Sequence, residues 1–125
     1  MVTTENQVFI QQVNDAFLNG DTGFFEAHVV DDVRWTVVGS PSIEGKAAFM
    51  AEIESMKAGP APELSITNVI VHEASAAVEG TMTINEAGVT KRYAFCDVYR
   101  LSGSGTGKIE EISTYMIELD PGGAS

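Results

Sequence analysis

Apolar residues near the N-terminus recur at i, i+4, i+7 and i+8, the spacing of one face of an amphipathic helix. These residues are Phe9, Val13, Ala16 and Phe17. Residues 4–7 (TENQ) fit a capping box, in which the first side chain caps the helix and the fourth reaches back to it. The pattern predicts a helix that begins after Thr4 and stops at residues 19–20, where Asn-Gly interrupts it.

Two shorter helices and one strand are predicted between residues 21 and 60. Asp21 can cap the first of these helices, which carries Phe24 and His28 one turn apart and ends near residues 31–32. Residues 34–38 (RWTVV) are typical of a strand. Gly45 begins the third predicted helix, which ends at residues 57–60. Its inner apolar stripe consists of Phe49, Met50, Ile53 and Met56.

From Pro62 onward the hydrophobic period changes to two, which indicates strands. Four strands are predicted over residues 64–72, 74–84, 90–101 and 109–119. Their connections are short enough for hairpins, so the four strands should form an antiparallel meander. We expect one α+β domain over residues 1–125, with a core from 5 to 119 and a frayed tail from 120 to 125.

Apolar residues on both sides of these strands predict that each face of the sheet is covered. In residues 93–101, Tyr93, Phe95 and Tyr99 share one face, while Cys96 and Val98 lie on the other. The three helices can cover only one face of the curved sheet. We therefore expect a homodimer that forms through the outer face of the sheet.

The strongly acidic composition excludes several classes of partner. Eighteen acidic and seven basic residues give a formal net charge of −11, which disfavours nucleic acid and anionic membranes and leaves neutral or apolar ligands as easier partners. The chain has no apolar run as long as a membrane helix and no basic-then-apolar N-terminal segment, so we expect a cytoplasmic protein. Cys96 is the only cysteine, and its place in an apolar strand predicts a buried thiol.

Asp97 is the main candidate for chemistry, because it lies among aromatic residues on the inner face of a predicted strand. Desolvating an unpaired carboxylate costs several kcal/mol, so Asp97 must pair, take up a proton or border a wet cavity. One interpretation is an acid with a raised pKa in a dry pocket; the other is a structural carboxyl tied to backbone donors or to a neighbouring His, Tyr or Trp. His28 is either a proton-relay partner of Asp97 or a core histidine.

Metal and phosphate sites have little support in the sequence. The two histidines, His28 and His72, lie on distant elements, and no cluster has the spacing of metal ligands. Residues 103–108 (GSGTGK) are one residue short of a phosphate-binding loop and precede a strand rather than a helix. We expect neither a metal nor a cofactor.

The element order and several local phrases resemble the SnoaL-like branch of the nuclear transport factor 2-like superfamily. The phrases are residues 31–39 (DDVRWTVVG), 43–46 (IEGK), 95–99 (FCDVY) and 107–109 (GKI). The resemblance covers the chain from about residue 7 to residue 119. It implies a cone-like α+β barrel, with three N-terminal helices packed on a curved, mostly antiparallel sheet and an apolar pocket between them.

The resemblance also implies which residues face the pocket. Asp97 matches the protonated acid of the ketosteroid isomerases in this superfamily, whereas Val13 and Val37 stand where those enzymes have a tyrosine and a general base. Thr114 stands where the limonene epoxide hydrolases have an aspartate, and residues 79–81 lack their Arg-x-Asp. The expected pocket residues are Val13, Phe17, Trp35, Val37, Met50, Val78, Gly80, Met82, Phe95, Tyr99, Thr114 and Met116. The missing side chain at Gly80 is expected to leave room inside the cone.

Two functions from different classes remain open. In the first, the protein performs acid–base chemistry of the isomerase, cyclase, hydrolase or dehydratase type on a small apolar carbonyl-bearing molecule, with Asp97 as the acid or base. In the second, it is a non-catalytic protein that binds such a molecule, or an accessory dimer. A second titratable group in the pocket would favour the enzyme.

Overall fold

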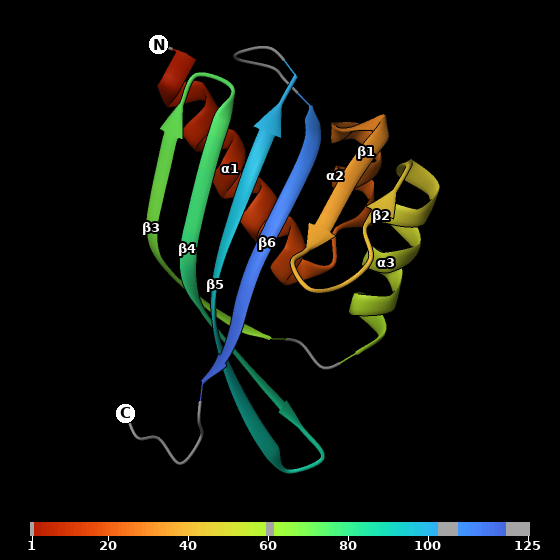
Figure 1. Ribbon diagram of the computed structural model, residues 1–125, viewed down its shortest axis with the longest axis vertical. Coiled ribbons are helices and arrows are strands. Elements are labelled where there is room, and N and C mark those ends of the chain that lie inside the picture. The colour runs from red at the N-terminus through yellow and green to blue at the C-terminus, as the bar shows by residue number, and fades with distance from the viewer. Residues whose placement is uncertain (1, 60–61, 103–107, 120–125) are drawn as a thin grey trace.

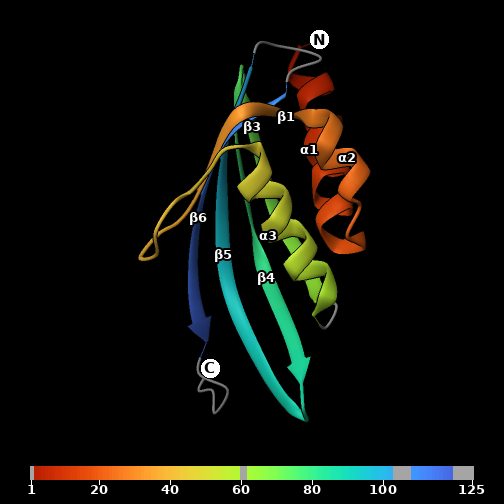
Figure 2. The ribbon, with the colours of Figure 1, turned by 90° about the vertical axis from the view of Figure 1, so that its right-hand side faces the viewer.

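Three helices pack on one face of a six-stranded, strongly curved sheet in the computed structural model, which describes residues 2–59, 62–102 and 108–119, without the side chains of residues 2–6 and 86. The helices are α1 (Val2–Asn19), α2 (Thr22–His28) and α3 (Lys46–Ala58). The strands are β1 (Val29–Val37), β2 (Ile43–Glu44), β3 (Glu63–His72), β4 (Ser75–Glu86), β5 (Val89–Leu101) and β6 (Ile109–Leu119). Figure 1 shows α1 crossing behind β3 to β6, and Figure 2 shows all three helices on the same side of the sheet.

The predicted helix ends are partly confirmed. α1 already includes Thr4, so the predicted cap at Thr4 is wrong. The stop after Asn19 is confirmed, and Gly20 has φ +65°, a left-handed conformation that favours glycine. The cap at Asp21 is also confirmed, because the Phe24 N–H donates to Asp21 Oδ1 at 3.1 Å. α2 ends at His28, earlier than predicted, because Val29 already has extended backbone angles and begins β1.

The sheet has the strand order β2-β1-β6-β5-β4-β3. The predicted antiparallel meander from β3 to β6 is confirmed. The sequence did not predict that β1 pairs in parallel with β6, or that the two-residue strand β2 pairs with β1. The predicted curved, mostly antiparallel sheet is confirmed. Over the described residues this mixed sheet does not close into a barrel, and β2 and β3 are its edges.

The hydrophobic core lies between the helices and the inner face of the sheet. It is built from fully buried side chains of all three helices and of β1, β4, β5 and β6. Rings of α1, α2, α3 and β1 pack into one cluster at tilted angles, in which the Phe17 and Trp35 centroids are 5.7 Å apart and those of Trp35 and Phe49 are 5.5 Å apart. The core therefore holds Trp35 rigidly beside α1 and α3.

Gly80 has a structural role that differs from the expected one. β3 has a bulge between Ile66 and Asn68, opposite Gly80 in β4. A Cβ built on Gly80 would clash with the Ser65 carbonyl oxygen and lie 3.1 Å from Ile66 Cα. The space beside Gly80 is thus occupied by the backbone of β3 and does not open the interior.

The outer face of the sheet carries exposed apolar residues beside a row of charges. Val98, Tyr115 and Ile117 are 41%, 51% and 68% exposed. The half-buried Cys96, which lies opposite Tyr115, is also on this face.

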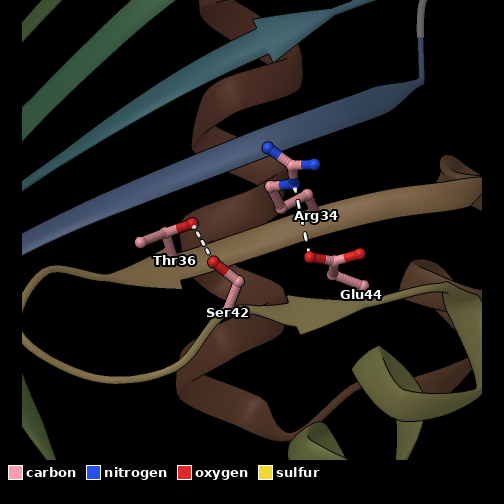
Figure 3. A network of polar contacts seen from close by, with 4 residues as sticks. All are labelled: Arg34, Thr36, Ser42 and Glu44. Carbon is pink, nitrogen blue, oxygen red and sulfur yellow. Dashed lines mark hydrogen bonds and ion pairs between the residues drawn. The ribbon is translucent and has the colours of Figure 1, made fainter.

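Polar contacts link β1 with β2 and the loop before it, at one edge of the sheet (Figure 3). Arg34 Nε lies 3.9 Å from Glu44 Oε2, and Thr36 Oγ1 lies 3.0 Å from Ser42 Oγ.

Candidate functional site

A cavity of about 120 Å³ lies between the inner face of the sheet, the C-terminal half of α1 and the end of α3. Among the described residues, its wall is almost entirely apolar, with three aromatic rings and three methionines, and Asp97 is the one charged residue. The lining residues are Asn14, Phe17, Trp35, Met56, Pro62, Leu64, Met82, Phe95, Asp97, Ile112, Thr114 and Met116. Small-molecule sites usually combine such an apolar wall with a few placed polar groups.

A chain of hydrogen bonds leads to Asp97 from two other strands. The Trp35 indole Nε1–H of β1 donates to Thr114 Oγ1 of β6 at 3.0 Å. The Thr114 hydroxyl in turn donates to Asp97 Oδ1 of β5 at 2.7 Å. The Thr114 hydroxyl accepts from Trp35 and donates its own hydrogen to Asp97, and this donated bond favours the ionised carboxylate. Within the described residues Oδ2 has no hydrogen-bond partner, so it is the oxygen that can contact a ligand.

The surroundings of Asp97 move its titration toward neutral pH. Burial raises the pKa of Asp97 from 3.8 to about 6, and the hydrogen bond from Thr114 opposes this by lowering the pKa. Desolvation is the larger effect because it penalises the charged carboxylate against an apolar wall. Both the protonated and the ionised form of Asp97 are therefore accessible near pH 6.

The structure brings together seven of the residues expected at the site and places the others elsewhere. Phe17, Trp35, Met82, Phe95, Asp97, Thr114 and Met116 lie on the cavity wall. Val13, Val78 and Tyr99 are buried in the core, and Val37 packs against the core. Met50 lines a separate groove between α2 and α3.

Tyr99 is fully buried, and its hydroxyl has no hydrogen-bond partner among the described residues. Burial, together with the negative charge of Asp97, raises the pKa of Tyr99 well above its usual value. Tyr99 is accordingly a neutral core residue behind the site, outside the cavity wall.

His28 does not meet Asp97. Its Nδ1 contacts the Phe24 carbonyl oxygen at 2.8 Å, within α2. Its ring stacks on Phe24, with centroids 4.3 Å apart, and lies 5.5 Å from the Phe9 ring. These contacts are those of a half-buried packing histidine, and the cavity lining does not include it.

Five cavity residues were missed by the sequence analysis: Asn14, Met56, Pro62, Leu64 and Ile112. Ile112 alternates with Thr114 and Met116, so the period of β6 could have found it. Leu64 is the register partner of Met82, which only the pairing of β3 with β4 reveals. On α1 it is Asn14, and not the buried Val13, that reaches the cavity.

No metal-binding cluster of three or more His, Cys, Asp or Glu side chains occurs among the described residues. None of the described helices combines the length and the hydropathy needed to span a membrane.

An open curved sheet with helices over one face and an apolar cavity between them defines an α+β pocket fold. A family model described as the SnoaL-like domain matches residues 10–112. The match extends over most of the chain, which therefore belongs to the SnoaL-like domain family. No curated protein matches the sequence.

Solved structures confirm the nuclear transport factor 2-like fold. An NTF2-like protein of unknown function from Cytophaga hutchinsonii is 26% identical, with a TM-score of 0.75 over 94% of this chain and 100% of its own. An LEH-like epoxide hydrolase from M. tuberculosis is 21% identical, with a TM-score of 0.80 over 92% of this chain and 84% of its own. A putative ketosteroid isomerase from Kribbella flavida is 17% identical, with a TM-score of 0.79 over 98% of this chain and 85% of its own.

Proposed function

We propose that this protein performs acid–base chemistry on a small, apolar, carbonyl-bearing molecule, with Asp97 as the group that moves the proton. The observation that carries the proposal is a carboxyl group on the wall of an apolar cavity, with a pKa raised to about 6 and one oxygen free of partners among the described residues. A general acid or base is most effective when its pKa lies near the working pH.

The arrangement favours proton transfer at Oδ2. The Thr114 hydroxyl holds Oδ1 of the carboxylate, which leaves Oδ2 to take a proton from the carbon next to the substrate carbonyl. The electron pair of the broken C–H bond moves onto the carbonyl oxygen and forms an enolate. In a substrate with a β,γ double bond, the enolate is a dienolate; return of the same proton to its γ-carbon moves the double bond into conjugation with the carbonyl and restores the carboxylate of Asp97. No other titratable side chain lies on the described cavity wall, so Asp97 would act in both directions.

Asn14 is the best candidate to bind the carbonyl oxygen. Its half-buried side chain lines the cavity and makes no hydrogen bond to other described residues. An amide N–H can donate to an oxygen that gains negative charge in the transition state. α1 would thus supply an amide donor from position 14, one residue after the buried Val13.

The volume of the cavity limits the substrate. An engineered apolar cavity of about 150 Å³ binds benzene. The cavity of about 120 Å³ therefore suits a single ring or a short branched chain, or one end of a longer molecule.

Deuterium exchange tests the proposal without knowledge of the natural substrate. Cyclic ketones of one ring are incubated with the protein in D₂O, and NMR follows exchange at the α-carbon. We expect exchange above the buffer rate for at least one ketone, and a loss of about 100-fold or more in Asp97→Asn. Asp15→Asn, an exposed site on α1, is the matched control and should exchange normally. Unchanged exchange in Asp97→Asn removes Asp97 from the chemistry.

The alternative is a non-catalytic ligand-binding or accessory protein. The observation that favours it is the presence of a single titratable group in the described lining. This alternative predicts that small apolar molecules bind and raise the melting temperature, whereas no ketone exchanges faster than in buffer.

We also propose that two copies associate through the outer face of the sheet. Strand pairing places Glu44, Arg34, Glu111 and Arg100 in one row across β2, β1, β6 and β5. The row alternates in sign and has no net charge, so a second copy meets no block of like charge beside the exposed apolar residues. A homodimer would cover Val98, Tyr115 and Ile117.

A further inference from the structure

A second hollow adjoins the Asp97 cavity and shares part of its wall. It measures about 140 Å³ and lies where the C-terminal ends of α1 and α3 approach each other. Phe17, Met56 and Pro62 line both hollows. Met56 is 42% exposed, and its unbranched side chain can change rotamer easily. The two hollows are therefore neighbouring chambers with a shared wall, which includes the adaptable side chain of Met56.

The outer chamber differs from the inner one in charge. Its wall includes Lys57, in the last turn of α3. The stem of Lys57 packs over Gly20, where an added Cβ would come within 3.0 Å of Lys57 Cγ. The absence of a side chain at Gly20 thus allows the lysine to lie along this wall.

Lys57 has no ion pair with another described residue. Three other basic residues do: Lys46 with Glu26, Arg34 with Glu44, and Arg100 with Glu111. Lys91, Arg92 and Lys108 also lack an ion pair with described residues, but Lys57 is the only basic residue in the described lining of either chamber.

We propose that the two chambers form one site for an amphipathic carboxylate, whose mostly apolar, carbonyl-bearing end lies beside Trp35 and Asp97 and whose carboxylate lies at Lys57. This inference rests on the proposed function, because it specifies the class of molecule that enters the Asp97 cavity. The reverse orientation is disfavoured, since it would place two carboxylates together in the apolar chamber. At Lys57 the ligand carboxylate keeps contact with both water and a cation.

Trp35 provides a direct reporter, because it is the only tryptophan and lies on the wall of the inner chamber. Bromine quenches tryptophan fluorescence on contact. We expect ω-bromooctanoate, which carries the bromine at its apolar end, to quench Trp35 strongly. α-Bromooctanoate, with the bromine beside the carboxylate, should bind with little quenching. Stronger quenching by the α-isomer would overturn the orientation.

Binding of octanoate and 1-octanol, measured by calorimetry at pH 8, tests the role of Lys57. Lys57→Met should lower the affinity for octanoate by about three- to fivefold, as expected for loss of an exposed ion pair. The affinity for octanol should not change. Lys57→Arg should bind octanoate as the parent protein does. Lys108→Met is the matched control for net charge, because β6 begins at the end of the molecule opposite the end of α3 (Figure 1).

The outcomes separate this inference from the proposed function. Equal effects of Lys57→Met and Lys108→Met on the affinity for octanoate would overturn the two-chamber site. Failure of both octanoate and 1-octanol to bind would also overturn it. Neither result bears on Asp97, whose role is decided by ketone exchange in Asp97→Asn.

Discussion

Asp97 is subject to two opposing influences, burial against an apolar wall and a hydrogen bond from Thr114, and burial is the stronger. The folded-state pKa of about 6 lies above the ordinary value of 3.8, so between these values the folded protein binds more protons than the unfolded chain. Asp97 therefore contributes stability below pH 4 that is lost as the pH rises through about 6.

The loss of stability with rising pH can be measured by comparing the parent protein with the Asp97→Asn variant. The pKa shift corresponds to about 3 kcal/mol, as an order of magnitude. The free energy of unfolding of Asp97→Asn minus that of the parent should therefore rise between pH 4 and pH 7 by up to about 3 kcal/mol. Urea unfolding at a series of pH values gives this difference. A difference independent of pH would show that the pKa of Asp97 is not raised.

Thr114 supplies an internal control for this titration. Thr114→Val removes the hydrogen bond that lowers the pKa of Asp97, so the pH at which stability is lost should move upward. Thr114→Ser retains the hydroxyl, so its stability should be lost at the same pH as that of the parent protein. A downward shift in Thr114→Val would contradict the direction assigned to this bond.

At the scale of elements, the contact between β3 and β4 depends on one residue without a side chain. The β3 bulge brings the Ser65 carbonyl oxygen into the space that a side chain at Gly80 would fill. This packing curves the edge of the sheet where Leu64 and Met82 line the cavity. The pocket wall and the bulge are thus structurally linked.

Gly80→Ala should destabilise the protein by about 2 kcal/mol, because the strand backbone must move to accept the methyl group. Gly23→Ala in α2 is the matched control, since its Cβ would approach only Asp21 Oδ1, at 3.6 Å. Alanine is a better helix former than glycine, so that variant should be neutral or more stable. Thermal unfolding of both variants tests this prediction. Equal melting temperatures for the two variants would refute the role given to Gly80.

At the scale of the whole molecule, the exposed apolar face predicts the oligomeric state. Ile117→Lys places a charge on the proposed interface, where Ile117 is 68% exposed. We expect a dimer for the parent and a monomer for this variant by sedimentation velocity. Val8→Lys, at a position 49% exposed on α1, is the control and should remain dimeric. A monomeric parent protein at micromolar concentration would overturn the proposal.

The strand meander was largely predictable from the sequence, whereas the rest of the sheet was not. The predicted ranges for β3 to β6 agree with the structure within two residues, because alternation and short hairpins are local properties. β2 has only two residues and leaves no periodic pattern. The sequence pattern predicts a helix over residues 29–32. In the structure they are part of β1 instead, because Val29 is buried and pairs with Ile109.

The sequence by itself determined that Asp97 shares an apolar strand face with Phe95 and Tyr99, because side-chain direction alternates along a strand. Only the tertiary structure decided which groups reach Asp97. Thr114 is 17 residues away along the chain, and Trp35 is 79 residues from Thr114. The pairing of β1 and β5 with β6 brings the three together, and no local pattern encodes that pairing. The inner and outer chambers likewise exist only where α1, α3 and the sheet meet.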